Sequence, residues 1–148
     1  PFLSSGLFWY LFASQARMTD NTARELRHTV RMGDLVGVRE LIKTGADYAA
    51  AADTLRRWTP LHIACHGSQK PHNDRDIVEE ILKAAKAAKK ENDVSKAKDA
   101  VEGLTPLQLA AERRDAMAAI NVEDKDALDE KRKVETICEW VEHGWKKD

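Results

Sequence analysis

The sequence predicts an all-α fold of stacked helix pairs, and three observations support this prediction. The composition is dominated by Ala, Leu, Glu, Lys and Arg and includes only seven glycines, which favours helices over strands. Apolar residues recur at helical spacing along most of the chain. One short motif, which starts at Thr59, returns in altered form at Thr105, and this indicates an internal repeat.

The motif has the properties of a helix start. A threonine in extended conformation can cap a helix, because its side-chain oxygen accepts a backbone N–H of the first turn. Proline is favoured at the next position, where its missing N–H has no consequence. The first copy consists of Thr59, Pro60, Leu61 and His62, and the second of Thr105, Pro106 and Leu107, with Gln108 in place of the histidine. Each copy therefore predicts the first turn of a helix.

The first copy matches the signature of the ankyrin repeat, and the chain resembles that family over about residues 22–146. The resemblance implies a solenoid of helix–turn–helix pairs joined by extended finger loops. We predict three degenerate repeats, at about residues 22–57, 58–103 and 104–146, within a domain of residues 18–148. In this family the histidine of the signature has a structural role, in hydrogen bonds to neighbouring repeats.

The first repeat lacks the signature, because Arg24-Glu25-Leu26-Arg27 stands in its place, as expected for a capping repeat. Its two helices are predicted to meet at Gly33 and to end before Gly45, which resemble the turn and exit glycines of the family. Residues 48–58 are predicted to form the finger that leads to the second repeat. In this finger Arg57 replaces the glycine that the family favours.

The second repeat contains insertions, since Thr59 and Thr105 lie further apart than the usual period of about 33 residues. Residues 68–75 are predicted to enlarge the turn between its helices. The second helix is predicted to begin near Asp74 or Asp76 and to continue as far as Lys90, because Ala and Lys are strong helix formers.

The third repeat has Gly103 at the finger position and Gly144 at the exit position of the family. Between its helices lies an insertion of about residues 115–132. We predict one long helix from about Lys125 to His143, with acidic residues near its start and a polar half that projects beyond the solenoid.

Residues 1–17 differ from the rest of the chain, because they hold a dense apolar and aromatic patch that includes Trp9 and Tyr10. The patch is shorter than the ~20 residues needed to span a bilayer, and it lacks the features of a secretory signal. Three interpretations stay open: a cap packed on the first repeat, a membrane anchor or buried contact in a larger assembly, and a leader before translation from Met18. Soluble monomers rarely expose such a patch, so we expect something to cover it.

The sequence offers little support for catalysis or for a metal site. The ligand-type residues that cluster are His62, Cys65, His66 and His72. Four such donors suffice for zinc, but His62 belongs to the repeat signature and Cys65 replaces a core alanine, where cysteine behaves as a small hydrophobe. For a nucleophilic Cys–His pair, the sequence marks no third residue that would orient the histidine. It also contains no glycine-rich loop that would bind phosphate. We expect no enzymatic activity, no cofactor and no metal.

The formal net charge of −1 provides no overall field that would attract nucleic acid. Lys83, Lys86 and Lys90 share one face of a predicted helix, but acidic neighbours dilute their charge and no aromatic residue is interleaved, so we expect no nucleic-acid partner. The two cysteines, Cys65 and Cys138, are too few for a disulfide framework and indicate an intracellular location, cytoplasmic or organellar.

The resemblance implies a protein–protein interaction module. Candidate partner-binding residues are Tyr48, Arg56, Arg57 and Trp58 on the finger, and Trp9 and Tyr10 in the N-terminal segment. In the alternative interpretation Trp58 packs on the next finger and the arginines are solvated. Two functions stay open. One is a scaffold-like structural or accessory subunit of a larger, membrane-associated complex. Residues 1–17 favour this function, because contact with a membrane or burial in the complex would cover their apolar side chains. The other is a freestanding soluble adaptor that binds its partners reversibly.

Overall fold

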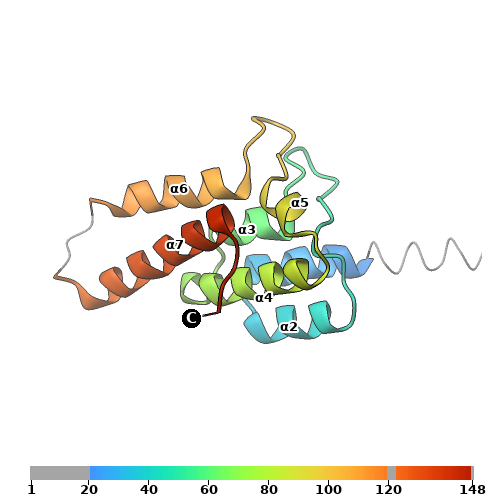
Figure 1. The fold of residues 1–148 in the computed structure, drawn as a ribbon, viewed down its shortest axis with the longest axis horizontal. Coiled ribbons are helices and arrows are strands. Elements are labelled where there is room, and N and C mark those ends of the chain that lie inside the picture. Colours follow the sequence, from blue (N-terminus) through green and yellow to red (C-terminus); the bar gives the residue numbers. More distant parts are fainter. Residues whose placement is uncertain (1–20, 120–122, 148) are drawn as a thin grey trace, which may run out of the picture.

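The computed structural model describes residues 21–119 and 123–147, and every regular element in these two ranges is helical (Figure 1). The N-terminal segment of residues 1–17, with Trp9 and Tyr10, lies outside the described residues. The first helix spans residues 21–32. It is followed by α2 (Leu35–Lys43), α3 (Pro60–His66), η1 (Pro71–Asn73), α4 (Asp74–Ala87), α5 (Glu91–Ser95), α6 (Pro106–Met117) and α7 (Lys125–His143).

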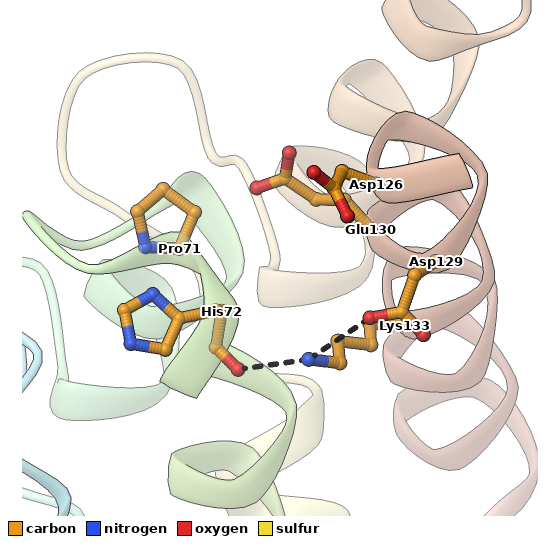
Figure 2. A pocket seen from close by; sticks show the side chains of 6 residues that line it. All are labelled: Pro71, His72, Asp126, Asp129, Glu130 and Lys133. Carbon is orange, nitrogen blue, oxygen red and sulfur yellow. Dashed lines mark hydrogen bonds and ion pairs between the residues drawn. The ribbon is translucent and has the colours of Figure 1, made fainter. Parts of the chain in front are cut away.

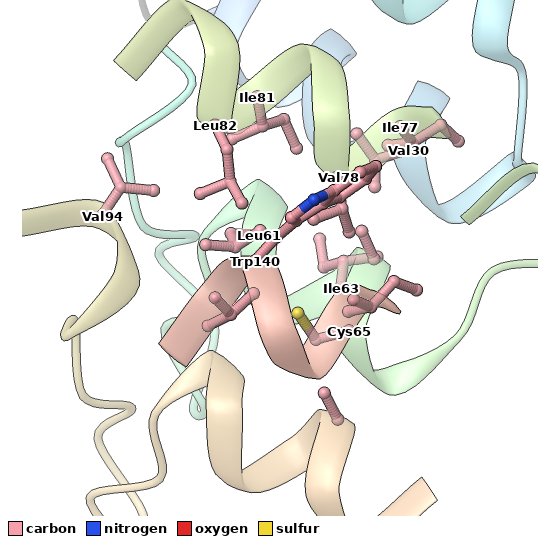
Figure 3. Packing of buried hydrophobic residues seen from close by; sticks show 14 of the residues in the cluster. Val30, Leu61, Ile63, Cys65, Ile77, Val78, Ile81, Leu82, Val94 and Trp140 are labelled. Atoms are coloured by element: carbon pink, nitrogen blue, oxygen red, sulfur yellow. The ribbon is translucent and has the colours of Figure 1, made fainter. Parts of the chain in front are cut away.

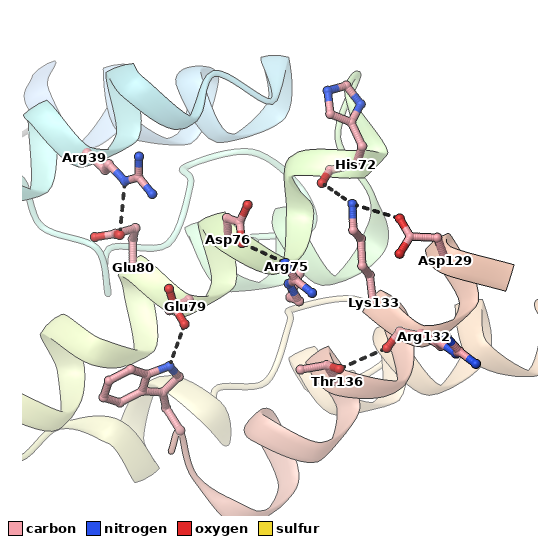
Figure 4. Close-up of polar contacts among 11 residues, drawn as sticks. Arg39, His72, Arg75, Asp76, Glu79, Glu80, Asp129, Arg132, Lys133 and Thr136 are labelled. Atoms are coloured by element: carbon pink, nitrogen blue, oxygen red, sulfur yellow. Dashed lines mark hydrogen bonds and ion pairs between the residues drawn. The ribbon is translucent and has the colours of Figure 1, made fainter. Parts of the chain in front are cut away.

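The helices form three consecutive pairs that stack side by side. In the outer row, α4 packs between α2 and α7, and in the inner row α3 packs against α6 (Figure 1). An ion pair between Arg39 Nε of α2 and Glu80 Oε1 of α4, 3.2 Å long, joins the first two outer helices (Figure 4). The bounds of α7 confirm the predicted long helix from Lys125 to His143.

One apolar core runs through all three pairs (Figure 3). Leu26 from the first pair, Leu61 from the second and Ile137 from the third are each buried. Trp140 of α7 lies in the same cluster and is labelled beside Leu61 in Figure 3. Because each fully buried side chain of this size contributes roughly 1.5–3 kcal/mol, the core joins the pairs into one cooperative unit.

The two threonine motifs start α3 and α6 in the way their residue types predict. Thr59 accepts a hydrogen bond from the backbone N–H of His62, and the His62 side chain accepts one from the backbone N–H of Thr59. Thr105 and Gln108 make the same reciprocal capping box at the start of α6. Each box satisfies two backbone donors that a helix start otherwise leaves unpaired.

Gly33 is required where the first helix turns into α2. Its φ is +73°, and a Cβ built there would lie 2.7 Å from the Cβ of Lys70. Both observations exclude a larger residue without local rearrangement, because L-residues rarely adopt such a φ and the gap is below a normal contact distance. The turn of the first helix pair therefore touches the longer turn between α3 and α4.

The predicted continuation of the second helix to Lys90 is wrong. α4 ends at Ala87, and Lys89 adopts a φ of 59°. The backbone N–H of Lys90 donates to Ala85 O at 2.8 Å and that of Lys89 to Lys86 O at 3.1 Å, which is the hydrogen-bond pattern of a Schellman cap. The chain then forms the short helix α5, which places Val94 in the core. Burial of Val94 thus overrides the local helix propensity of the Ala-Lys run.

The turn between α3 and α4 contacts the first half of α7. Lys133 Nζ of α7 donates to His72 O at 3.4 Å and lies 3.3 Å from Asp129 Oδ2 (Figures 2 and 4). The predicted projection of the polar half of α7 is therefore wrong at Lys133, which packs against η1. A shallow groove of about 320 Å³ between Pro71 and Glu130 marks this junction (Figure 2).

Candidate functional site

Two finger loops lie side by side at one edge of the stack. We call residues 45–58 the first finger and residues 96–104 the second finger. The backbone N–H of Ala100 in the second finger donates to Arg56 O in the first at 2.9 Å. Counted back from the capping threonines, Leu55 in the first finger occupies the same position as Val101 in the second. Side chains at matching positions therefore repeat along this edge.

Both fingers expose an aliphatic side chain at that matching position. Leu55 is 85% exposed and Val101 is 53% exposed. Exposed aliphatic residues scattered singly need no explanation. These two lie on neighbouring fingers whose backbones are joined by a hydrogen bond, and we call the pair the fingertip patch.

The sequence difference at the finger glycine has a structural consequence. Arg57 adopts a φ of 53°, close to the φ of 68° that Gly103 adopts at the matching position of the second finger. The first finger thus keeps the left-handed backbone conformation at this position although arginine replaces glycine. The backbone of Arg57 is strained, because residues with a Cβ rarely adopt this conformation. The side chains of Arg56 and Arg57 are both exposed.

Trp58 serves an internal role. Its Nε1 donates to Asp99 Oδ2 at 3.1 Å, its ring lies 4.9 Å from that of His66, and the Arg56 guanidinium lies 5.0 Å from its centroid. The indole is half-buried. This geometry corresponds to the alternative in which Trp58 packs on the next finger, and it leaves the outer part of the ring and Arg56 accessible.

Asp99 organises the second finger. Its Oδ1 accepts the backbone N–H groups of Glu102 at 3.0 Å and Leu104 at 3.1 Å, while Oδ2 accepts the Trp58 indole. Burial opposes ionisation of the carboxyl, but these hydrogen bonds outweigh it and lower the pKa of Asp99 to about 2. Asp99 is therefore a charged anchor for both fingers at neutral pH.

His62 links the second helix pair to the finger that leads to the third. Its Nε2 lies 2.9 Å from Leu104 O, and burial lowers the pKa of His62, so a neutral ring is favoured. In the first helix pair Arg27 stands at the position that the sequence aligns with His62, and its Nη1 donates to Ala50 O at 3.1 Å. Both residues tie an inner helix to a finger.

Tyr48 also has an internal contact. Its hydroxyl lies 3.4 Å from Ala84 O of α4, and burial raises the pKa of this phenol. The side chain is half-buried. Of the four finger candidates, Arg56 and Arg57 are thus the most accessible, whereas Tyr48 and Trp58 each have one polar atom engaged within the chain.

The structure does not bring the side chains of the sequence cluster together as a metal-binding group; the cluster consists of His62, Cys65, His66 and His72. Cys65 is fully buried, and burial raises the pKa of its thiol. Within residues 21–119 and 123–147, no group of three or more His, Cys, Asp or Glu side chains is placed to hold a metal ion. Cys65 and Cys138 are free thiols in the core.

The sequence analysis missed a basic groove beside the first finger. The helix of residues 21–32 contributes Arg24, Arg27, His28 and Arg31, and the finger contributes Ala52, Asp53 and Thr54. The groove has a volume of about 430 Å³. The signal was present, because basic residues at positions i, i+3, i+4 and i+7 share one helix face.

A C-terminal contact was missed as well. Trp145 Nε1 donates to Glu79 Oε2 at 3.2 Å, and Lys86 Nζ donates to Trp145 O at 2.9 Å. The Lys86 ammonium also lies 5.7 Å from the centroid of the indole. The segment after α7 is thereby fixed on α4, and Lys86 is used within the chain.

Residues 56–93 match the sequence model of the family described as Ankyrin repeat. This segment is an ankyrin repeat. The match runs from Arg56 in the first finger through α3 and α4 into α5. No curated protein and no solved structure matches the chain. Ankyrin repeats are protein–protein interaction modules and are generally non-catalytic.

Among the described helices, none has the length and apolar content needed to cross a membrane.

Proposed function

We propose that this ankyrin-repeat protein is a non-catalytic structural or accessory subunit of a larger complex, and that its fingertip patch contacts a neighbouring protein. The observation that supports this most strongly is the exposure of Leu55 and Val101 at matching positions of adjacent fingers. A partner that covers both side chains removes apolar surface from water, which favours association by about 25 cal/mol per Å².

The fingers suit a lasting contact because they are held in place before binding. Trp58, Asp99 and the backbone bond between Ala100 and Arg56 connect them. A pre-ordered surface loses little conformational entropy on association. Arg56 and Arg57 flank the patch, and arginine is enriched among residues that contribute most to binding energy.

The apolar sequence of residues 1–17 supports a fixed place in an assembly, since burial against a protein or a membrane would cover it. Trp9 and Tyr10 are the proposed contact residues there. Free thiols at Cys65 and Cys138 are consistent with a reducing, intracellular compartment. The alternative function is a freestanding adaptor, which the exposed fingertip patch would serve equally well.

Site-specific photocrosslinking tests the proposal. A photoreactive phenylalanine analogue replaces Leu55 in one version of the full chain and Val36 in another. Val36 is the matched control, because it is 69% exposed but lies on α2, away from the fingers. We expect position 55 to crosslink one protein in high yield in cells, and position 36 not to crosslink it. Equal crosslinking at both positions, or none at either, contradicts the proposed contact.

A further inference from the structure

The basic groove is a charged concave surface that the fingertip patch does not explain. Arg24, His28 and Arg31 line one wall from the helix of residues 21–32, and Asp53 and Thr54 line the other from the first finger. The chain as a whole has a formal net charge of −1. The basic residues of this groove are therefore a local concentration of positive charge on a nearly neutral protein.

The groove is held in shape by a contact at its base. Arg27 is buried, and its Nη1 donates to Ala50 O, which ties the helix to the finger. His28 and Arg31 are exposed at the rim. Because Arg27 ties the helix to the finger, the groove between them is present before any ligand binds, and His28 and Arg31 lie on its helix side.

We infer that the basic groove binds an extended acidic segment of a partner protein, an inference that rests on the proposed function as an interaction module. A guanidinium presents a planar fork of donors that matches a carboxylate. Arg24 and Arg31 are two helical turns apart along one helix face, a spacing that fits carboxylates on an extended peptide. The oxygen atoms of Asp53 and Thr54 accept backbone N–H groups of the same peptide.

The composition of the walls favours a peptide over nucleic acid or an anionic membrane. The Asp53 carboxylate would repel a continuous row of phosphates, whereas a peptide can place an N–H beside it. None of the described residues that line the groove is Phe, Tyr or Trp, so the groove lacks the large aromatic platforms that single-stranded nucleic acid stacks on. The groove, of about 430 Å³, is concave, whereas a membrane surface is flat.

Fluorescence anisotropy with fluorescein-labelled octaglutamate as the probe tests the inference on the full chain at low salt. We expect wild-type protein to bind the probe, and R24Q/R31Q to bind at least ~10-fold more weakly, because two charge-assisted contacts are lost. The matched control is K43Q/K83Q, which removes the same charge from exposed positions on α2 and α4. It should change affinity by less than about twofold. Circular dichroism melting shows whether each variant is folded.

Three outcomes overturn the inference: no binding of octaglutamate by the wild-type chain, an equal loss in K43Q/K83Q, or tighter binding of an octanucleotide RNA or of phosphatidylserine vesicles through the same arginines. Failure of the proposed function is distinguishable. If crosslinking at position 55 fails while octaglutamate binds the groove, only the fingertip contact is wrong. If crosslinking succeeds and octaglutamate does not bind, only the acidic ligand is wrong.

Discussion

The indole Nε1 of Trp58 donates to the Asp99 carboxylate across 3.1 Å and joins the two fingers of the stack. Together with the hydrogen bond from Ala100 N to Arg56 O, this contact fixes the spacing between the fingertips. A residue that we expected to contact a partner therefore holds in place the surface on which that partner is proposed to bind.

Replacement of Trp58 by phenylalanine should keep most of the packing on His66 and remove the indole donor. Hydrogen bonds to charged groups contribute about 1.5–3 kcal/mol, so we expect the free energy of unfolding to fall by about 2 kcal/mol. Urea denaturation measures this change. An unchanged transition would mean that the Asp99 contact contributes nothing.

The pH dependence of stability should reveal Asp99. The folded-state pKa of about 2 lies below the unfolded value of about 4, so ionised Asp99 stabilises the fold above about pH 4. That stabilisation is lost as the pH falls toward about 2. Because other carboxyls titrate in the same range, the difference between wild type and D99N is the quantity to measure, and it should shrink over this interval. A constant difference would contradict the assigned pKa.

Asp74 and Arg113 form an ion pair of 2.8 Å in which the Asp74 side chain is 1% exposed and the Arg113 side chain 13%. Burial raises the pKa of Asp74, against the opposing effect of Ser68 and Arg113. We expect D74N to destabilise the protein by about 1–3 kcal/mol, because the nearly buried Arg113 guanidinium loses its charge partner while the desolvation cost of the Asp74 carboxylate is relieved. In a double-mutant cycle, D74N/R113M should lose less than the sum of the single variants. Strict additivity would exclude the coupling.

Arg57 should tolerate glycine better than most exposed positions would. At a φ of 53° an L-residue is strained by roughly 1–2 kcal/mol, which exceeds the ~0.5–1 kcal/mol lost when glycine increases unfolded-chain entropy. We expect R57G to raise the free energy of unfolding by about 0.5 kcal/mol. The matched control is R56G, which should not stabilise the protein, because Arg56 has no positive φ and its cation–π contact with Trp58 is lost.

The predictable part of the fold is the part encoded by local chemistry. The threonine–proline motifs predicted the starts of α3 and α6, because a cap and its first turn depend on adjacent residues. The acidic start and apolar stripe of α7 predicted its bounds for the same reason. α5 was missed, since its presence depends on the burial of Val94 rather than on propensity.

The candidate site was less predictable because its contacts join distant parts of the chain. Nothing near Trp58 in the sequence identifies Asp99 as its acceptor. The hydrogen bond from Trp145 Nε1 to Glu79 Oε2 was missed for the same reason, because the two residues are far apart in the sequence. The basic groove is different, since the spacing of Arg24, His28 and Arg31 is visible in the sequence; what required the structure was the opposing wall of the first finger.

Sedimentation of the native protein in mild detergent tests the central claim most directly. The chain alone has a mass of 16.7 kDa. We predict that wild type and V36S migrate with a much larger particle, and that L55S/V101S moves toward the mass of the free chain while remaining folded. Migration of wild-type protein as a free chain would contradict the claim of a fixed subunit. Retention of L55S/V101S in the large particle would contradict the claim that the fingertip patch holds it there.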